Sequence, residues 1–134
     1  MPRAVNSFDV FDTLIARRGV EPRGVLDRLE AASRFAGLAE ARLQADRQLG
    51  ALGRPYQLHD IWQEVRRTTA LDAATTDRLQ ELEVRIEHDE CIPIVENLTL
   101  VRDGDVLVSD AYLPPAVIRS LLSHVGLDRQ AALV

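Results

Sequence analysis

Two short segments of this 134-residue sequence carry side chains suited to chemistry at phosphorus. The first contains Asp9, Asp12 and Thr13 after a short apolar run, and the second contains Ser109 and Asp110 after three apolar residues. A carboxylate at the end of a strand can attack phosphorus or bind a hard cation such as Mg²⁺, and a hydroxyl can donate to phosphoryl oxygens. The alternative is structural, because an aspartate in this position also caps the backbone of an ordinary turn.

Both segments stand at the ends of predicted strands. We expect buried strands over residues 4–10 and 106–108, which are short, apolar and rich in β-branched residues, and a third strand beginning at 131–134. Each of the first two strands is followed by a turn and then by helical periodicity, which indicates an α/β sheet. Such sheets bind ligands beyond the carboxyl ends of their strands, so we expect Asp9 and Ser109 at one binding edge.

The residues between these strands are predicted to be almost entirely helical. Apolar residues recur at helical spacing through 21–90, with breaks near Gly37 and in the Gly- and Pro-containing loop at 50–55. Pro22 stands near the first helical position, and Thr75 with Thr76 could cap the last of four helices.

Two further helices are expected after Pro93. One covers residues 94–102, and the other begins at Pro114 and ends at Gly126.

Composition restricts the classes of partner. The net charge is -5, which argues against nucleic acid as a ligand, since duplex binding draws most of its affinity from basic residues. We expect no membrane span, because no apolar run reaches the length of one, and a cytoplasmic location. The single cysteine, Cys91, rules out an internal disulfide and fits a reducing compartment. Arg17 and Arg18 are expected to be a solvated pair, with contact to an anionic substrate as the alternative.

The segment FDVFDTL at residues 8–14 resembles the first motif of the haloacid dehalogenase (HAD) superfamily. The segment VLVSDAYLP at residues 106–114 resembles the second motif of the same superfamily. The resemblance implies a partial Rossmannoid parallel sheet of about three strands. That core would comprise residues 1–20 and 91–134, and residues 21–90 would form an inserted, all-helical cap.

The resemblance also implies roles for individual residues. Asp9 would be the nucleophile that forms an aspartyl phosphate, and Asp9 with the backbone carbonyl of Phe11 would ligate Mg²⁺. Thr13, Ser109 and Asp110 would bind a small phosphorylated substrate. The complete family form would thus be a phosphatase acting through a covalent intermediate.

Three features depart from the family pattern. Phe11 stands where family phosphatases usually have a second aspartate that acts as general acid, and Asp12 is the nearest candidate to replace it. The sequence contains no lysine, which the third motif requires, and the fourth, acidic motif does not occur, so we expect the amino-terminal part of a catalytic domain. Two alternatives stay open: a 2-haloacid dehalogenase-type hydrolase, or a non-catalytic remnant or protein-interaction module. The second would self-associate through an exposed sheet edge.

Overall fold

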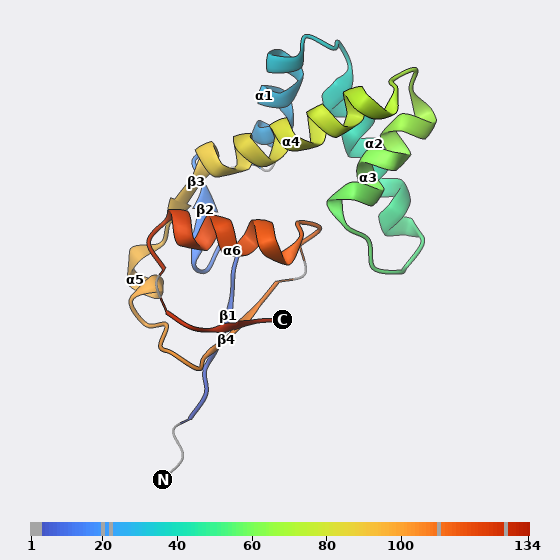
Figure 1. Cartoon of the computed structure of the whole chain (residues 1–134). Helices are drawn as coiled ribbons and strands as arrows, with labels where there is room; N and C mark the ends of the chain where they lie inside the picture. Colours follow the sequence, from blue (N-terminus) through green and yellow to red (C-terminus); the bar gives the residue numbers. More distant parts are fainter. Residues whose placement is uncertain (1–3, 20, 22, 110, 128) are drawn as a thin grey trace.

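The computed structural model describes residues 4–19, 21, 23–109, 111–127 and 129–134. Within these residues the chain is a mixed α/β structure with six helices and five short strands, which confirms the predicted α/β class (Figure 1). In chain order the elements are β1 (Ser7–Asp9), β2 (Ile15–Arg17), α1 (Arg23–Ser33), α2 (Leu38–Ala51), α3 (Leu58–Thr68), α4 (Ala73–Glu90), β3 (Cys91–Pro93), α5 (Val95–Leu98), β4 (Val106–Val108), α6 (Pro115–His124) and β5 (Ala132–Leu133).

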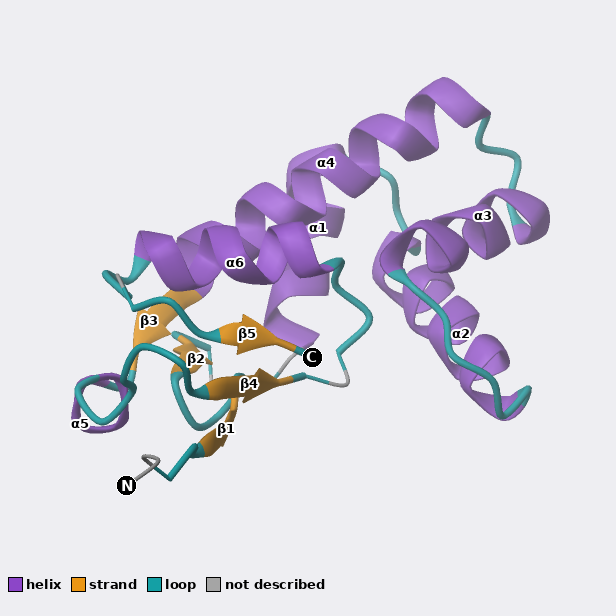
Figure 2. Ribbon diagram, turned by 60° about the horizontal axis from the view of Figure 1, so that its bottom comes forward, coloured by secondary structure: helices purple, strands orange, loops and turns teal. Residues whose placement is uncertain are grey.

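The main sheet is parallel and has the strand order β1-β4-β5 (Figure 2). Asp9 lies opposite Val108 in the register, and the Val10 N–H extends the pairing by donating to the Val108 carbonyl over 3.1 Å. Because the strands are parallel, the residues that follow β1 and β4 emerge at the same edge of the sheet. The expected parallel sheet of about three strands is therefore present.

The first strand is shorter and more exposed than the sequence predicts. The apolar pattern favours a buried strand over residues 4–10, but β1 is three residues long and only Phe8 among them is half-buried. The reason is that a helix, α6, covers only one face of the sheet. Leu107 faces that helix and joins the buried cluster that includes Leu121, whereas its neighbour Val108 is 37% exposed. Figure 2 shows α6 over that one face.

A second, two-stranded sheet does not follow from the sequence pattern. β2 pairs antiparallel with β3, with Ala16 opposite Ile92, and the Arg18 N–H continues the pairing to the Glu90 carbonyl over 2.8 Å. Helices α1 to α4 therefore begin and end on neighbouring strands, which form a stem for the helical segment. Strands of three residues give no alternating pattern long enough to be read from sequence.

The helices confirm several expected starts and correct others. α4 is capped by Asp72, whose carboxylate accepts the Thr75 N–H over 2.8 Å, so the expected capping by Thr75 and Thr76 is wrong. The expected helix over 94–102 is reduced to the short α5. Pro22 lies outside the described residues, and α1 begins at Arg23.

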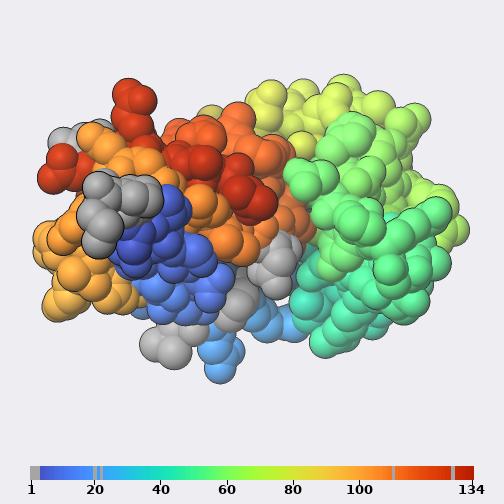
Figure 3. Space-filling view, turned by 90° about the horizontal axis from the view of Figure 1, so that it is seen from below, coloured from blue at the N-terminus to red at the C-terminus, as the bar shows by residue number. Residues whose placement is uncertain are grey.

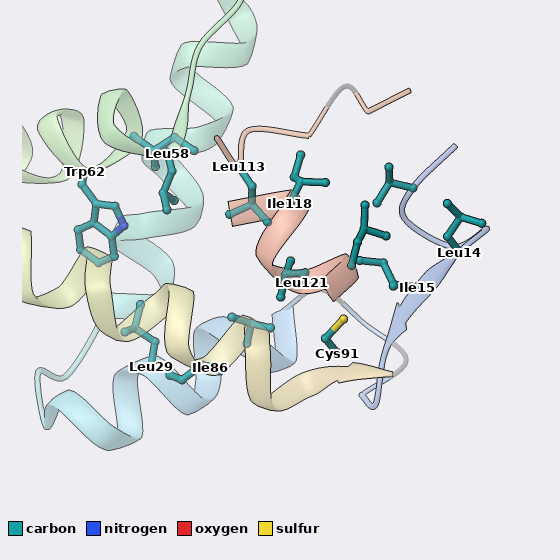
Figure 4. Close-up of a cluster of buried hydrophobic side chains, with 14 of the residues drawn as sticks. Leu14, Ile15, Leu29, Leu58, Trp62, Ile86, Cys91, Leu113, Ile118 and Leu121 are labelled. Carbon is teal, nitrogen blue, oxygen red and sulfur yellow. The ribbon is translucent and has the colours of Figure 1, made fainter. Parts of the chain in front are cut away.

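One continuous apolar cluster joins the helical segment to the sheet. It includes Leu29 and Trp62 of the helical segment, Ile86 of α4, Cys91 of β3 and Leu121 of α6 (Figure 4). α4 and α6 are in contact, so α4 belongs to both parts of the core. In the described part of the chain, no helix combines the length and apolarity needed to cross a membrane.

Candidate functional site

A pocket of about 250 Å³ lies at the carboxyl ends of β1 and β4. It is lined by Asp9, Val10, Phe11, Val108 and Ser109. Asp9 is exposed and Ser109 is half-buried, so both can meet a ligand from solvent. The structure thus brings together three of the residues singled out from the sequence, from segments that lie far apart in the chain.

The turn after β1 leaves backbone donors without a protein acceptor. The Val10 carbonyl accepts the N–H groups of Leu14 (2.9 Å) and Ile15 (3.1 Å), and the Asp12 N–H donates to the Ile15 carbonyl over 2.7 Å. Asp12 adopts a left-handed conformation with φ of 62°, which aspartate tolerates better than most residues. In the described part of the chain the N–H groups of Phe11 and Thr13 have no acceptor, so they are available to an anion.

Ser109 is held at the pocket by its own backbone. Its N–H donates to the Val134 carbonyl over 3.2 Å, and its Oγ accepts the Ala111 N–H over 3.3 Å. This arrangement leaves the hydroxyl proton free to donate to a ligand. Ser109 is therefore positioned as a donor beside Asp9.

Of the other expected site residues, the structure describes two. Asp12 and Thr13 are not among the described residues that line the pocket, and the Thr13 carbonyl accepts the Asn97 side-chain amide over 2.8 Å. Asp110 lies outside the described residues. The roles expected for Asp12, Thr13 and Asp110 stay predictions.

Arg17 is not the solvated residue that the sequence indicated. Its Nε and Nη2 each donate to the Glu87 carboxylate over 3.0 Å, and its guanidinium carbon lies 4.9 Å from the centre of the Phe11 ring. Burial alone lowers the pKa of Arg17, but the hydrogen bond and charge of Glu87 outweigh it and raise that pKa. Arg17 therefore covers the aromatic residue that lines the pocket.

Arg42 likewise pairs with a buried glutamate and lies over an aromatic ring, here in the loop that follows β4. Its Nε and Nη2 each donate to the Glu83 carboxylate over 2.8 Å, and Trp62 Nε1 donates to the same carboxylate over 3.1 Å. The Arg42 guanidinium carbon lies 4.9 Å from the centre of the Tyr112 ring. Burial, aided by the Glu83 charge, raises the pKa of Tyr112 to about 12, so its hydroxyl stays protonated at neutral pH.

α4 therefore holds both site loops through two buried glutamates one helical turn apart. Glu83 and Glu87 are 0% and 1% exposed, and each orients an arginine against an aromatic residue that closely follows a sheet strand. Sequence reasoning missed all of these contacts. One signal was present, because Glu83 and Glu87 share a helix face with Leu79 and Ile86, where apolar residues are the norm.

The described residues do not complete the expected magnesium site. They contain no group of three histidine, cysteine, aspartate or glutamate side chains that could hold a metal ion. The Asp9 carboxylate and the Phe11 carbonyl would supply two oxygen ligands, whereas Mg²⁺ requires near-octahedral oxygen coordination.

Cys91 of β3 should react slowly with alkylating reagents in the folded protein. Burial, with a contribution from the Glu87 charge, raises its thiol pKa to about 11, and only the thiolate is nucleophilic. At about pH 8 we expect iodoacetamide to label the native chain at least ~100-fold more slowly than the urea-unfolded chain, as followed by intact mass. The rate should rise with pH well above the usual range for a thiol. Equal rates for native and unfolded chains would contradict the buried position.

Comparison of the sequence with protein-family models and with curated proteins finds no match. What bears on function is therefore the pair of motifs and the pocket at which they meet. Its combination of a carboxylate, a hydroxyl and backbone donors suits the binding of a phosphoryl group and nucleophilic attack on it.

Proposed function

We propose that this chain carries the catalytic nucleophile of a HAD-like hydrolase that acts on small phosphate monoesters. The observation that supports it is that Asp9 and Ser109 line one pocket at the ends of neighbouring parallel strands. In this proposal residues 1–20 and 91–134 form the catalytic core, and residues 21–90 form its helical cap. The stem of β2 and β3 supports that division, because the helical segment begins and ends there.

The proposed reaction has two steps. A carboxylate oxygen of Asp9 attacks phosphorus, the bond from phosphorus to the leaving oxygen breaks, and the leaving oxygen takes up a proton from water. Water then attacks the phosphorus of the aspartyl phosphate, which releases inorganic phosphate and restores the Asp9 carboxylate. The Ser109 hydroxyl and the N–H groups of Phe11 and Thr13 bind the phosphoryl oxygens as negative charge develops on them.

Phe11 determines which leaving groups the site can serve. It lines the pocket in place of the general acid found in family phosphatases, and a phenyl ring cannot transfer a proton. We therefore infer that esters with acidic leaving groups, such as aryl phosphates, react faster than simple alkyl phosphates. Mg²⁺ is implied by the family resemblance; the Asp9 carboxylate and the Phe11 carbonyl would hold it, and it would neutralise phosphoryl charge.

Binding of inorganic phosphate provides the direct test. A ligand that binds only the native state raises its melting temperature, and a hundredfold excess over Kd should raise it by about 5–10 °C. We expect this shift in differential scanning fluorimetry with phosphate and Mg²⁺ together, and a much smaller one with Ser109→Ala. Ser123→Ala on the exposed end of α6 is the matched control and should behave as the unsubstituted chain. An unchanged melting temperature would favour the non-catalytic alternative.

A second candidate function draws on the same nucleophile. Phe11 presents an apolar wall beside Asp9, with Arg17 stacked on its ring, and 2-haloacid dehalogenases of the superfamily also lack the second aspartate. In that reaction the Asp9 carboxylate would attack carbon and displace a halide, which needs neither a metal nor a proton donor for the leaving group.

A further inference from the structure

A second pocket adjoins the proposed phosphoryl site and shares Ser109 with it. It has a volume of about 460 Å³, which falls in the range of small-molecule sites. Its described lining comes from the α2–α3 connection and from the loop after β4: Arg54, Pro55, Tyr56, Gln57, Ser109, Ala111 and Tyr112. A phosphate monoester bound between Asp9 and Ser109 would extend its organic part into this neighbouring space. In Figure 3 the part of the helical segment that contains α2 and α3, in green, lies beside the orange and red C-terminal part of the chain.

Arg54 gives this second pocket a positive charge. Among its described lining residues Arg54 is the one charged side chain. No described carboxylate forms an ion pair with Arg54, although Arg54 also lines an adjoining pocket that contains Asp60 and Glu64. Arg17 and Arg42, by contrast, are each neutralised by a buried glutamate. In a chain of net charge -5, a guanidinium that no described carboxylate pairs with, beside the Asp9 pocket, favours an anionic group of the ligand.

Hydrogen bonds fix the backbone on both sides of the second pocket, in the α2–α3 connection and in the loop after β4. The Tyr56 hydroxyl donates to the Asp46 carboxylate, and the Gln57 N–H donates to the Asp60 carboxylate over 2.8 Å. The Leu58 N–H then joins the insertion to the site loop by donating to the Tyr112 carbonyl over 2.7 Å. The backbone on both sides of the pocket is thus held before a ligand arrives, which reduces the ordering cost of binding.

We propose that Arg54 binds a carboxylate of the substrate, so that the substrate class is small phosphate monoesters that also carry a carboxylate. This inference rests on the proposed function, because the phosphoryl group must occupy the Asp9 pocket for the organic part to reach Arg54. A guanidinium suits the task because it can donate two parallel hydrogen bonds to one carboxylate. Arg54 is then a specificity-determining residue.

The test compares two ligands that differ only in that carboxylate. Affinities of 3-phosphoglycerate, glycerol 3-phosphate and inorganic phosphate are measured by isothermal titration calorimetry on the full chain with Mg²⁺ present. We expect 3-phosphoglycerate to bind about tenfold more tightly than glycerol 3-phosphate. Arg54→Ala should abolish this preference and leave the affinity for inorganic phosphate unchanged. Arg47→Ala removes an exposed arginine of α2 outside this pocket and should preserve the preference.

The outcomes separate the two proposals. Binding of inorganic phosphate without any preference for 3-phosphoglycerate would overturn the role of Arg54 and leave the phosphoryl site standing. A preference for 3-phosphoglycerate that persists in the Arg54→Ala variant would likewise overturn the role of Arg54. Failure of inorganic phosphate to bind would overturn the proposed function, and the Arg54 inference with it.

Discussion

Replacing Asp9 with asparagine is expected to abolish turnover of p-nitrophenyl phosphate, with a loss of at least ~10³-fold in kcat. The amide is a poor nucleophile toward phosphorus, although it keeps nearly the same shape and fits the same pocket. The aryl ester is the substrate of choice because its leaving group needs no proton donor, and the phenyl ring of Phe11 in the Asp9 pocket cannot supply one. The measurement is release of p-nitrophenol, together with intact mass after brief reaction to detect a phosphorylated chain.

Asp12→Asn is the matched control for this change. Asp12 is also an exposed carboxylate of the same turn, but it is not among the described residues that line the Asp9 pocket. We expect its loss of kcat to be well below that of Asp9→Asn. If the Asp9→Asn variant retains turnover, Asp9 is not the nucleophile. Metal-independent halide release from a 2-haloacid, without phosphate release, would instead favour the dehalogenase alternative.

Replacing Glu83 with alanine is expected to lower the free energy of unfolding by ~3–5 kcal/mol. The substitution leaves the Arg42 guanidinium, whose side chain is 1% exposed, without a counter-charge and removes the acceptor of Trp62 Nε1. Urea unfolding followed by the fluorescence of Trp62, the single tryptophan, measures the change.

Glu81→Ala on the same helix is the control for the Glu83 change. Glu81 is exposed, and its substitution should change the free energy of unfolding by less than ~0.5 kcal/mol. The double substitution Arg42→Met with Glu83→Leu should recover much of the loss, because it removes both buried charges together. Equal losses for Glu81→Ala and Glu83→Ala would show that the buried ion pair does not stabilise the fold.

The sequence predicted those parts of the fold that depend on local pattern. Three apolar residues followed by Ser109 gave β4 with its correct bounds, and the apolar spacing from Leu58 to Val65 gave α3. The meeting of Asp9 and Ser109 also followed from local pattern, since strand ends in a parallel sheet share an edge. The shorter β1 was not predictable, because its exposure depends on which face of the sheet α6 covers.

The contacts that orient the site could not be predicted in this way. Arg42 and Glu83 are 41 residues apart, and Arg17 and Glu87 are 70 apart, so no periodicity relates the members of either pair. The second pocket likewise depends on the α2–α3 connection reaching Ser109. Each of these features arises from tertiary packing between segments whose own patterns are ordinary.

The stem of β2 and β3 has an evolutionary consequence. Because the helical segment begins and ends on paired strands, such a segment can be gained or exchanged at that point without altering the register of the parallel sheet. Side-chain packing, however, opposes removal of the helical segment. Ile86 shares one apolar cluster with Leu121, so excising the helices would expose the inner face of α6 to water. The helical segment and α6 therefore depend on each other for burial, so the chain should tolerate changes in the loops between these helices better than loss of the helices themselves.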